Sequence, residues 1–260
     1  MFQDILTEQK GRIGIITINR PQVSNALART TYGEIRRAVE DYEKDDSIGA
    51  ILITGKGKHF SAGGDIVRFK QLIDSGVFLE EGPIEEAFQM SRAIRLCSKP
   101  VTAMINGVAT GAGLSIALAC DFRTGTAKSK LVMAFVKMGL SGDTGAIYFL
   151  NKLLGAGKAA EMIMTGTPVA GEEAFRLGLL NRLSEEDSLE ADTMEFVGTL
   201  ANMPHFAIRK QKELINDFFY KDLDEFSGPE TKAMSACSRT ADFKEAVNAF
   251  LEKRAPEFNK

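Results

Sequence analysis

The sequence is poor in the residues that build metal centres, disulfide frameworks and histidine-dependent active sites. Its three cysteines, Cys97, Cys120 and Cys237, lie far apart and form no CxxC pair. This pattern is typical of reduced thiols in a cytoplasm and argues against a zinc site, so we expect no metal. Its two histidines are His59 and His205, and neither is placed to activate a serine nucleophile.

Long apolar runs and excess positive charge are also missing. No run approaches the ~18–20 residues of a membrane span. The first ten residues lack the basic region and apolar segment of a secretory signal. A net charge of −3 argues against binding to nucleic acid, and the small basic cluster Arg209, Lys210 and Lys212 is weak support for it. We therefore expect a cytoplasmic protein that binds neither a membrane nor nucleic acid.

The chain is organised as strands that alternate with helices, followed by helices alone. With 260 residues it fits one large domain, or one domain with a smaller appendage. Alternation continues to about Leu183, which is typical of an α/β domain with largely parallel strands. We predict a core over 1–200 and a helical region over 201–260. The predicted strands include 13–19, 50–54, 122–126 and 131–134, and the predicted helices are 26–43, 65–74, 84–97, 114–120, 144–154, 158–165, 188–202, 206–219, 223–236 and 242–253.

The stretch Pro100–Asp121 predicts a buried strand, a turn with three glycines and a helix that is apolar on every side. The glycines are Gly107, Gly111 and Gly113, and the helix covers Leu114–Cys120. Backbone N–H groups at a helix N-terminus carry partial positive charge and stabilise an anion placed against them. We expect this turn to hold either a bound phosphate or a charge that develops during a reaction.

A second corner of the same kind occurs at His59–Asp65, where a glycine-rich loop follows the predicted strand 50–54. Two such corners can converge and form an oxyanion hole, in which each N–H donor contributes about a hundred- to a thousand-fold in rate. On spacing alone, two ordinary turns between a strand and a helix explain the pattern equally well.

Four motifs tie these corners to a known family. They are N-R-P-x-x-x-N-A-L at Asn19–Leu27, F-S-A-G-G-D-I at Phe60–Ile66, K-P-V-x-A-x-I-N-G at Lys99–Gly107 and G-x-G-x-x-x-A at Gly111–Ala117. Through them the sequence resembles the crotonase superfamily, the enoyl-CoA hydratase/isomerase family, from Asn19 to the C-terminus. The resemblance implies an α/β fold with a crotonase-like ββα-spiral core and a C-terminal all-helical trimerisation region. It also implies an acyl-CoA thioester substrate, no cofactor other than its coenzyme A, and a homotrimer or homohexamer.

The resemblance also places site residues. It implies oxyanion donors at the backbone N–H groups of Gly64 and Ala112, where the family usually has glycine at the second position; a methyl group is tolerated there if φ is negative. Phe250 would lie against the adenine and Lys253 near a phosphate, whereas an ordinary amphipathic helix would bury Phe250 and solvate Lys253. The residues implied to bind CoA or the acyl group are Ser24, Ala26, Ala28, Ala62, Gly63, Asp65, Ile66, Gly111, Phe135, Phe250 and Lys253.

Both glutamates of the hydratase pattern are replaced. Ser115 stands three residues after the second donor, and Phe135 stands at the other glutamate position. Two carboxylates are well suited to holding and deprotonating the water that adds to a conjugated double bond. A standard two-glutamate hydratase is therefore disfavoured.

One carboxylate remains in this region, Asp143 in the segment M-G-L-S-G-D-T-G-A. The segment resembles that of family isomerases that act on ring-derived and unsaturated acyl-CoAs, with Gly142 where proline is common. In them the matching aspartate shuttles a proton between carbons, and shielding from water would raise its pKa toward that task. The alternative is that Asp143 only caps a helix that begins at Thr144.

Other functions stay open. Asp143 could be the nucleophile of an aryl-CoA dehalogenase, although those enzymes carry tryptophan and histidine where this chain has Phe135 and Val136. A thioester hydrolase, and a catalytically silent CoA- or RNA-binding oligomer, are further alternatives. We expect the acyl pocket to be shaped by Phe69–Met90, whose Phe78, Phe88 and Met90 suggest an apolar group.

Overall fold

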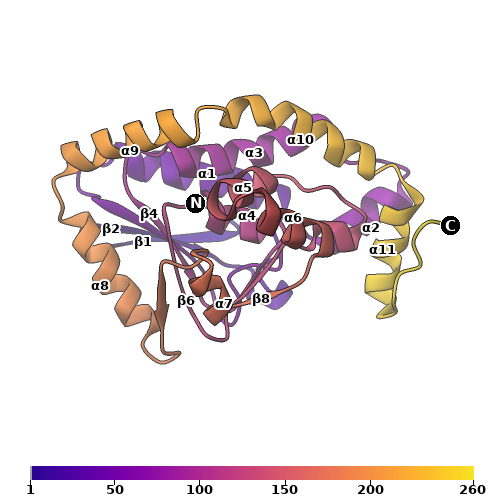
Figure 1. The fold of residues 1–260 in the computed structure, drawn as a ribbon, viewed down its shortest axis with the longest axis horizontal. Helices are drawn as coiled ribbons and strands as arrows, with labels where there is room; N and C mark the ends of the chain where they lie inside the picture. The colour runs from indigo at the N-terminus through magenta and orange to yellow at the C-terminus, as the bar shows by residue number, and fades with distance from the viewer. Residues whose placement is uncertain (1) are drawn as a thin grey trace.

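The centre of the fold is a six-stranded sheet with the order β1-β2-β3-β4-β6-β9 (Figure 1). The structure is a computed structural model that describes residues 2–260; Met1, the first residue of the predicted core, lies outside them. Strands β1 and β2 pair antiparallel, and the other neighbours pair parallel. The six strands are β1 (Ile5–Lys10), β2 (Ile13–Ile18), β3 (Ala50–Gly55), β4 (Val101–Ile105), β6 (Phe122–Thr126) and β9 (Arg182–Ser184).

A smaller sheet lies beside the first and is made of three short strands. These are β5 (Val108–Thr110), β7 (Lys130–Val132) and β8 (Val169–Ala170). Strand β5 lies between Gly107 and Gly111, so part of the stretch predicted as a glycine turn is a short strand that carries the chain from one sheet into the other.

Helices surround both sheets (Figure 1). The helices of the core are α1 (Arg29–Lys44), α2 (Ile66–Asp74), α3 (Glu81–Leu96), α4 (Ala112–Ala119), α5 (Ala146–Leu154), α6 (Ala156–Thr165), α7 (Gly171–Arg176) and α8 (Leu189–Ala201), with 3₁₀ turns η1 (Pro21–Val23) and η2 (Ala134–Met138). Three more follow, α9 (His205–Phe219), α10 (Leu223–Cys237) and α11 (Ala241–Glu252). Helix α10 packs along α3, and α11 packs against α2 and η2. The boundary predicted between 200 and 201 falls at the end of α8 and stays a prediction.

Two predicted elements explain why the core forms where it does. Every residue of β3 is buried, as expected for a parallel strand covered on both faces. Every residue of α4 is buried too, since its small apolar side chains fit against neighbours in all directions. Both predictions are confirmed, and together they place the glycine turn at the centre of the molecule.

Two helices begin later than predicted, and some strands, β1 among them, were not predicted. Helix α1 begins at Arg29 rather than residue 26, because Leu27 pairs with Gly64 in an isolated bridge. Helix α5 begins at Ala146 rather than Thr144, because the preceding residues have positive φ. Strand β1 was not predicted, since only Ile5 of its six residues is buried and its sequence carries no apolar pattern. Among residues 2–260, no helix combines the length and apolar character that crossing a membrane requires.

Candidate active site

A cavity of about 810 Å³ lies where the glycine corners meet α1, α2, α3, η2 and α11. It brings together every predicted site residue except Ala28 and Lys253. The predicted residues that line it are Ser24, Ala26, Ala62, Gly63, Gly64, Asp65, Ile66, Gly111, Ala112, Phe135, Asp143 and Phe250. Segments more than a hundred residues apart in the sequence therefore share one site.

The first glycine corner is held by backbone hydrogen bonds on both sides of Gly64. The N–H of Leu27 donates to the carbonyl of Gly63 at 2.7 Å, and the N–H of Asp65 donates to the carbonyl of Leu27 at 3.2 Å. Within residues 2–260 the N–H of Gly64 itself has no acceptor. Gly64 thus presents a fixed and unused donor at the cavity wall.

The second corner supplies a matching donor. Ala112 is the first residue of α4, so its N–H precedes the hydrogen-bond ladder of the helix. A methyl group built on Gly63 would lie 3.6 Å from the nitrogen of Ala112 and 2.7 Å from the carbonyl oxygen of Thr110. Gly63, with φ of 83°, therefore allows the two corners to touch. Ala112 itself does not have a positive φ, so its methyl group causes no backbone strain.

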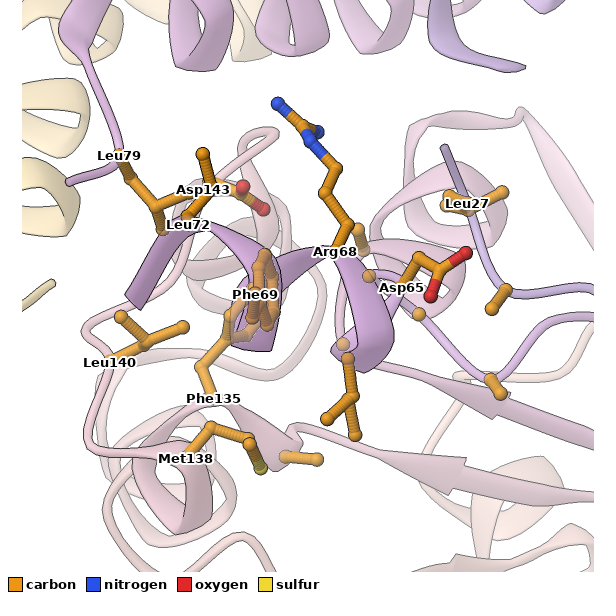
Figure 2. Close-up of a pocket in the computed structure, with 18 of the residues that line it drawn as sticks. Leu27, Asp65, Arg68, Phe69, Leu72, Leu79, Phe135, Met138, Leu140 and Asp143 are labelled. Carbon is orange, nitrogen blue, oxygen red and sulfur yellow. The ribbon is translucent and has the colours of Figure 1, made fainter. Parts of the chain in front are cut away.

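Asp143 projects its carboxylate into this cavity from the loop between η2 and α5 (Figure 2). It is 9% exposed, and the hydroxyl of Thr144 donates to its Oδ1 at 3.2 Å. Burial raises the pKa of Asp143 to about 6, while the bond from Thr144 opposes the rise. A carboxylate with such a pKa can accept and return a proton near neutral pH.

The helix-cap interpretation of Asp143 is wrong. The N-cap of α5 is Gly145, and no side chain caps the helix. Gly142, Thr144 and Gly145 have φ of 127°, 57° and 78°, so the loop turns through the left-handed region around Asp143. A β-branched residue such as Thr144 adopts positive φ only at a cost, which is common at functional sites.

The two positions that carry glutamate in hydratases hold groups that cannot replace it. Ser115 is fully buried, and its hydroxyl donates to the carbonyl oxygens of Gly111 at 3.3 Å and Asp143 at 3.4 Å. It ties the two loops together, which agrees with a packing role. Phe135 is 7% exposed and forms part of the cavity wall beside Gly111.

Asp65 is the other carboxylate near the donors, but it is already used. It accepts from the N–H of Val67 at 3.1 Å as the N-cap of α2. It also forms an ion pair with Arg20 at 3.1 Å. Asp65 therefore fixes the start of α2 beside the oxyanion corner and is not free to act as a base.

The wall near Asp143 is apolar (Figure 2). It is formed by Phe69, Leu72, Leu79, Phe135, Met138 and Leu140. Phe78, from the segment predicted to shape the acyl pocket, also lines the cavity. Phe88 and Met90 do not line it, because they are buried in the core at 1% and 0% exposure.

Comparisons with known proteins agree with this architecture. The family model described as enoyl-CoA hydratase/isomerase matches residues 8–260. The chain belongs to the enoyl-CoA hydratase/isomerase family. It is 33% identical to a crotonyl-CoA hydratase of Syntrophomonas wolfei over 99% of this chain and 98% of that protein. It is 31% identical to a trans-2-decenoyl-[acyl-carrier-protein] isomerase of Streptococcus mutans, with the same coverage.

A solved enoyl-CoA hydratase from Mycobacterium avium subsp. paratuberculosis superposes with a TM-score of 0.91, at 28% identity over 100% of both chains. The predicted α/β crotonase fold with its C-terminal helices is thereby confirmed. The chain is an enzyme of the hydratase/isomerase family.

Helix α11 and the tail behind it also contribute to the wall of the cavity in this family member. Phe250 is 59% exposed and lines the cavity, as do Leu251, Arg254 and Pro256. Lys253 ends α11 with φ of 57° and lies outside the lining. Ala28, the N-cap of α1, also lies outside it.

Tyr32 of α1 and Arg68 of α2 are among the polar residues of the cavity that were missed from the sequence. A signal for Arg68 exists, because helical spacing puts it on the same face as Asp65 and Leu72. Tyr32 gave no signal of its own, since it occupies an apolar position of an amphipathic helix.

Proposed function

We propose that the enzyme isomerises the double bond of an unsaturated or cyclic acyl-CoA, with Asp143 as the base. The observation that carries the proposal is the burial of this one carboxylate in the apolar wall. Of the three carboxylates that line the cavity, Asp65 is paired with Arg20 and Glu80 is exposed. Asp143 is the carboxylate left to act on the acyl group.

The backbone donors supply the other half of the chemistry. The thioester oxygen accepts from the N–H groups of Gly64 and Ala112, which stabilises the negative charge that develops on it. Asp143 takes a proton from one carbon, and the electron pair of that C–H bond enters the dienolate. The same proton then returns from Asp143 to another carbon, so the double bond moves and no atom is gained or lost.

Hydration is the neighbouring reaction within the family, and Asp143 could direct a water molecule. The absence of carboxylates at Ser115 and Phe135 favours isomerisation over it, because the water would lack its usual pair of partners.

Coenzyme A is expected to bind against Ser24, Ala26 and Phe250, which line the cavity. The helical region is expected to join three or six copies of the chain. Support comes from the exposed apolar side chains of α9, which are Phe206, Leu214, Ile215, Phe218 and Phe219. Light scattering measures the mass of the assembly, which should be that of a trimer or a hexamer.

The reaction is tested by incubating the enzyme with a panel of 2-enoyl-, 3-enoyl-, cyclic dienoyl- and haloaryl-CoA thioesters. Isomerisation leaves the mass of an enoyl-CoA unchanged and moves its vinyl proton resonances, whereas hydration adds the mass of one water. Asp143→Asn should lower turnover by about 10²- to 10⁴-fold. Asp74→Asn, which removes an exposed carboxylate from the end of α2, is the control. The proposal would be wrong if Asp143→Asn turned over a 3-enoyl-CoA at the wild-type rate, or if the enzyme released halide from a haloaryl-CoA.

A further inference from the structure

Arg68 is a cation without an ion-pair partner in the cavity. It extends from α2 into the space beside Asp143 (Figure 2) and is half-buried. Within residues 2–260 it forms neither an ion pair nor a hydrogen bond with another side chain or a carbonyl. Two of the three other cations that line the cavity are paired, Arg29 with Glu86 and Arg254 with Glu245.

Tyr32 faces the same space from α1. It is 9% exposed and lines the cavity, and its hydroxyl makes no hydrogen bond with residues 2–260. Asp143, Arg68 and Asp65 line the same cavity as Tyr32, and burial together with the charges of the two carboxylates raises the pKa of Tyr32, while the charge of Arg68 opposes the rise. The hydroxyl of Tyr32 and the half-buried guanidinium of Arg68 both line the cavity and make no bond to the protein, so both donors are available to a ligand.

The chemistry of the two donors defines that ligand. A guanidinium presents several N–H groups in a plane that matches a carboxylate, and a phenol adds one more donor. The wall around them is apolar, and a charge-assisted hydrogen bond is stronger where water is excluded. A ligand group with two acceptor oxygens and a negative charge would satisfy both residues.

We infer that the acyl group of the substrate carries a carboxylate, which Arg68 and Tyr32 bind inside the cavity. This inference rests on the proposed function, since it assumes that the cavity holds the acyl part of a CoA thioester. The positive charge of Arg68 also offsets the repulsion between the substrate carboxylate and Asp143. The substrate class is therefore a CoA monothioester of an unsaturated dicarboxylic acid.

A phosphate of coenzyme A is also an anion that Arg68 could bind, so the acyl carboxylate has to be distinguished from it. Lys137 also lines the cavity without an ion pair, but it is exposed and so is suited to a solvated phosphate. Arg68 lies beside Phe69 and Leu72 of the apolar wall, where an acyl group fits better than a phosphate.

The test compares two saturated, unreactive thioesters of equal chain length, glutaryl-CoA and pentanoyl-CoA, by calorimetric titration. The protein should bind glutaryl-CoA at least about tenfold more tightly. Arg68→Met should abolish this preference, and Tyr32→Phe should reduce it. Lys70 lies on the same helix and is paired with Asp74, so Lys70→Met removes a cation that does not line the cavity. This variant should keep the preference for glutaryl-CoA.

The measurement does not require turnover, so it separates this inference from the proposed reaction. Equal binding of the two thioesters, or a preference that survives Arg68→Met, overturns it. If Arg68→Met weakens free CoA and both thioesters to the same extent, then Arg68 binds a phosphate and the inference is wrong. A preference for glutaryl-CoA in a protein that isomerises nothing would support the site and refute the reaction.

Discussion

The carboxylate of Glu230 accepts a hydrogen bond from the backbone N–H of Gly145 at 2.7 Å, which joins α10 to the loop that carries Asp143. Glu230 is 5% exposed, and its second oxygen has no partner within residues 2–260. Burial raises the pKa of Glu230 to about 8; the bond from Gly145 opposes the rise, and the charge of Asp143 adds to it. Helix α10 of the C-terminal region thus contacts the loop that carries Asp143.

Replacing Glu230 should therefore change stability in a pH-dependent way. Because its pKa rises on folding from 4.5 to about 8, its contribution to stability is full below pH 4.5 and is lost as the pH rises through about 8. Glu230→Gln keeps an acceptor for Gly145 and has no such loss. The free energy of unfolding of Glu230→Gln, relative to wild type, should increase between about pH 5 and about pH 8.5 in urea titrations.

Glu230→Ala supplies the contrast, since it leaves the N–H of Gly145 buried without an acceptor. It should lower the free energy of unfolding by about 1–3 kcal/mol. If the free energies of unfolding of Glu230→Gln and wild type differ by the same amount at both pH values, then the pKa of Glu230 does not change on folding, contrary to this prediction.

The pH dependence of turnover should reveal the raised pKa of Asp143. A base must be deprotonated, so kcat/KM should rise with pH through about 6, the raised pKa of Asp143. The bond from the hydroxyl of Thr144 lowers this pKa. Thr144→Ala should therefore move the rise to higher pH, whereas Thr144→Ser keeps the hydroxyl and should move it less. A profile that is flat from about pH 5 to about pH 8 would argue against Asp143 as the base.

The parts of the fold that were predicted correctly carry their signal in short stretches of sequence. The run at 50–54 and the helix Leu114–Cys120 are apolar throughout, so burial follows from composition alone. Strand β1 and the start of α5 depend on contacts elsewhere in the chain. Thr144 in particular has no local preference for positive φ, and its conformation is set by the packed loop around it.

The predicted site residues show the same distinction between local sequence signals and contacts made by packing. Gly64, Ala112 and Asp143 were found because they lie within motifs that a sequence displays directly. Glu230 was missed because its contact with Gly145 arises only when α10 packs beside a loop far away in the sequence. Arg68 was missed although helical spacing puts it on the same face as Asp65, because the cavity that this face lines forms only in the fold. Sequence reasoning finds the groups at the ends of strands and helices, and the packing of the helices supplies the rest.

The proposed oxyanion role of Ala112 can be tested by removing its backbone N–H. Proline has no N–H, yet it is well tolerated at the first position of a helix, which Ala112 occupies in α4. Ala112→Pro should therefore remove one donor, lower kcat by about 10²- to 10³-fold and leave the helix in place. Ala112→Gly retains the N–H and should keep most of the turnover. Circular dichroism would establish that both variants fold, and a folded Ala112→Pro enzyme with the kcat of wild type would show that this N–H does not stabilise the reacting thioester.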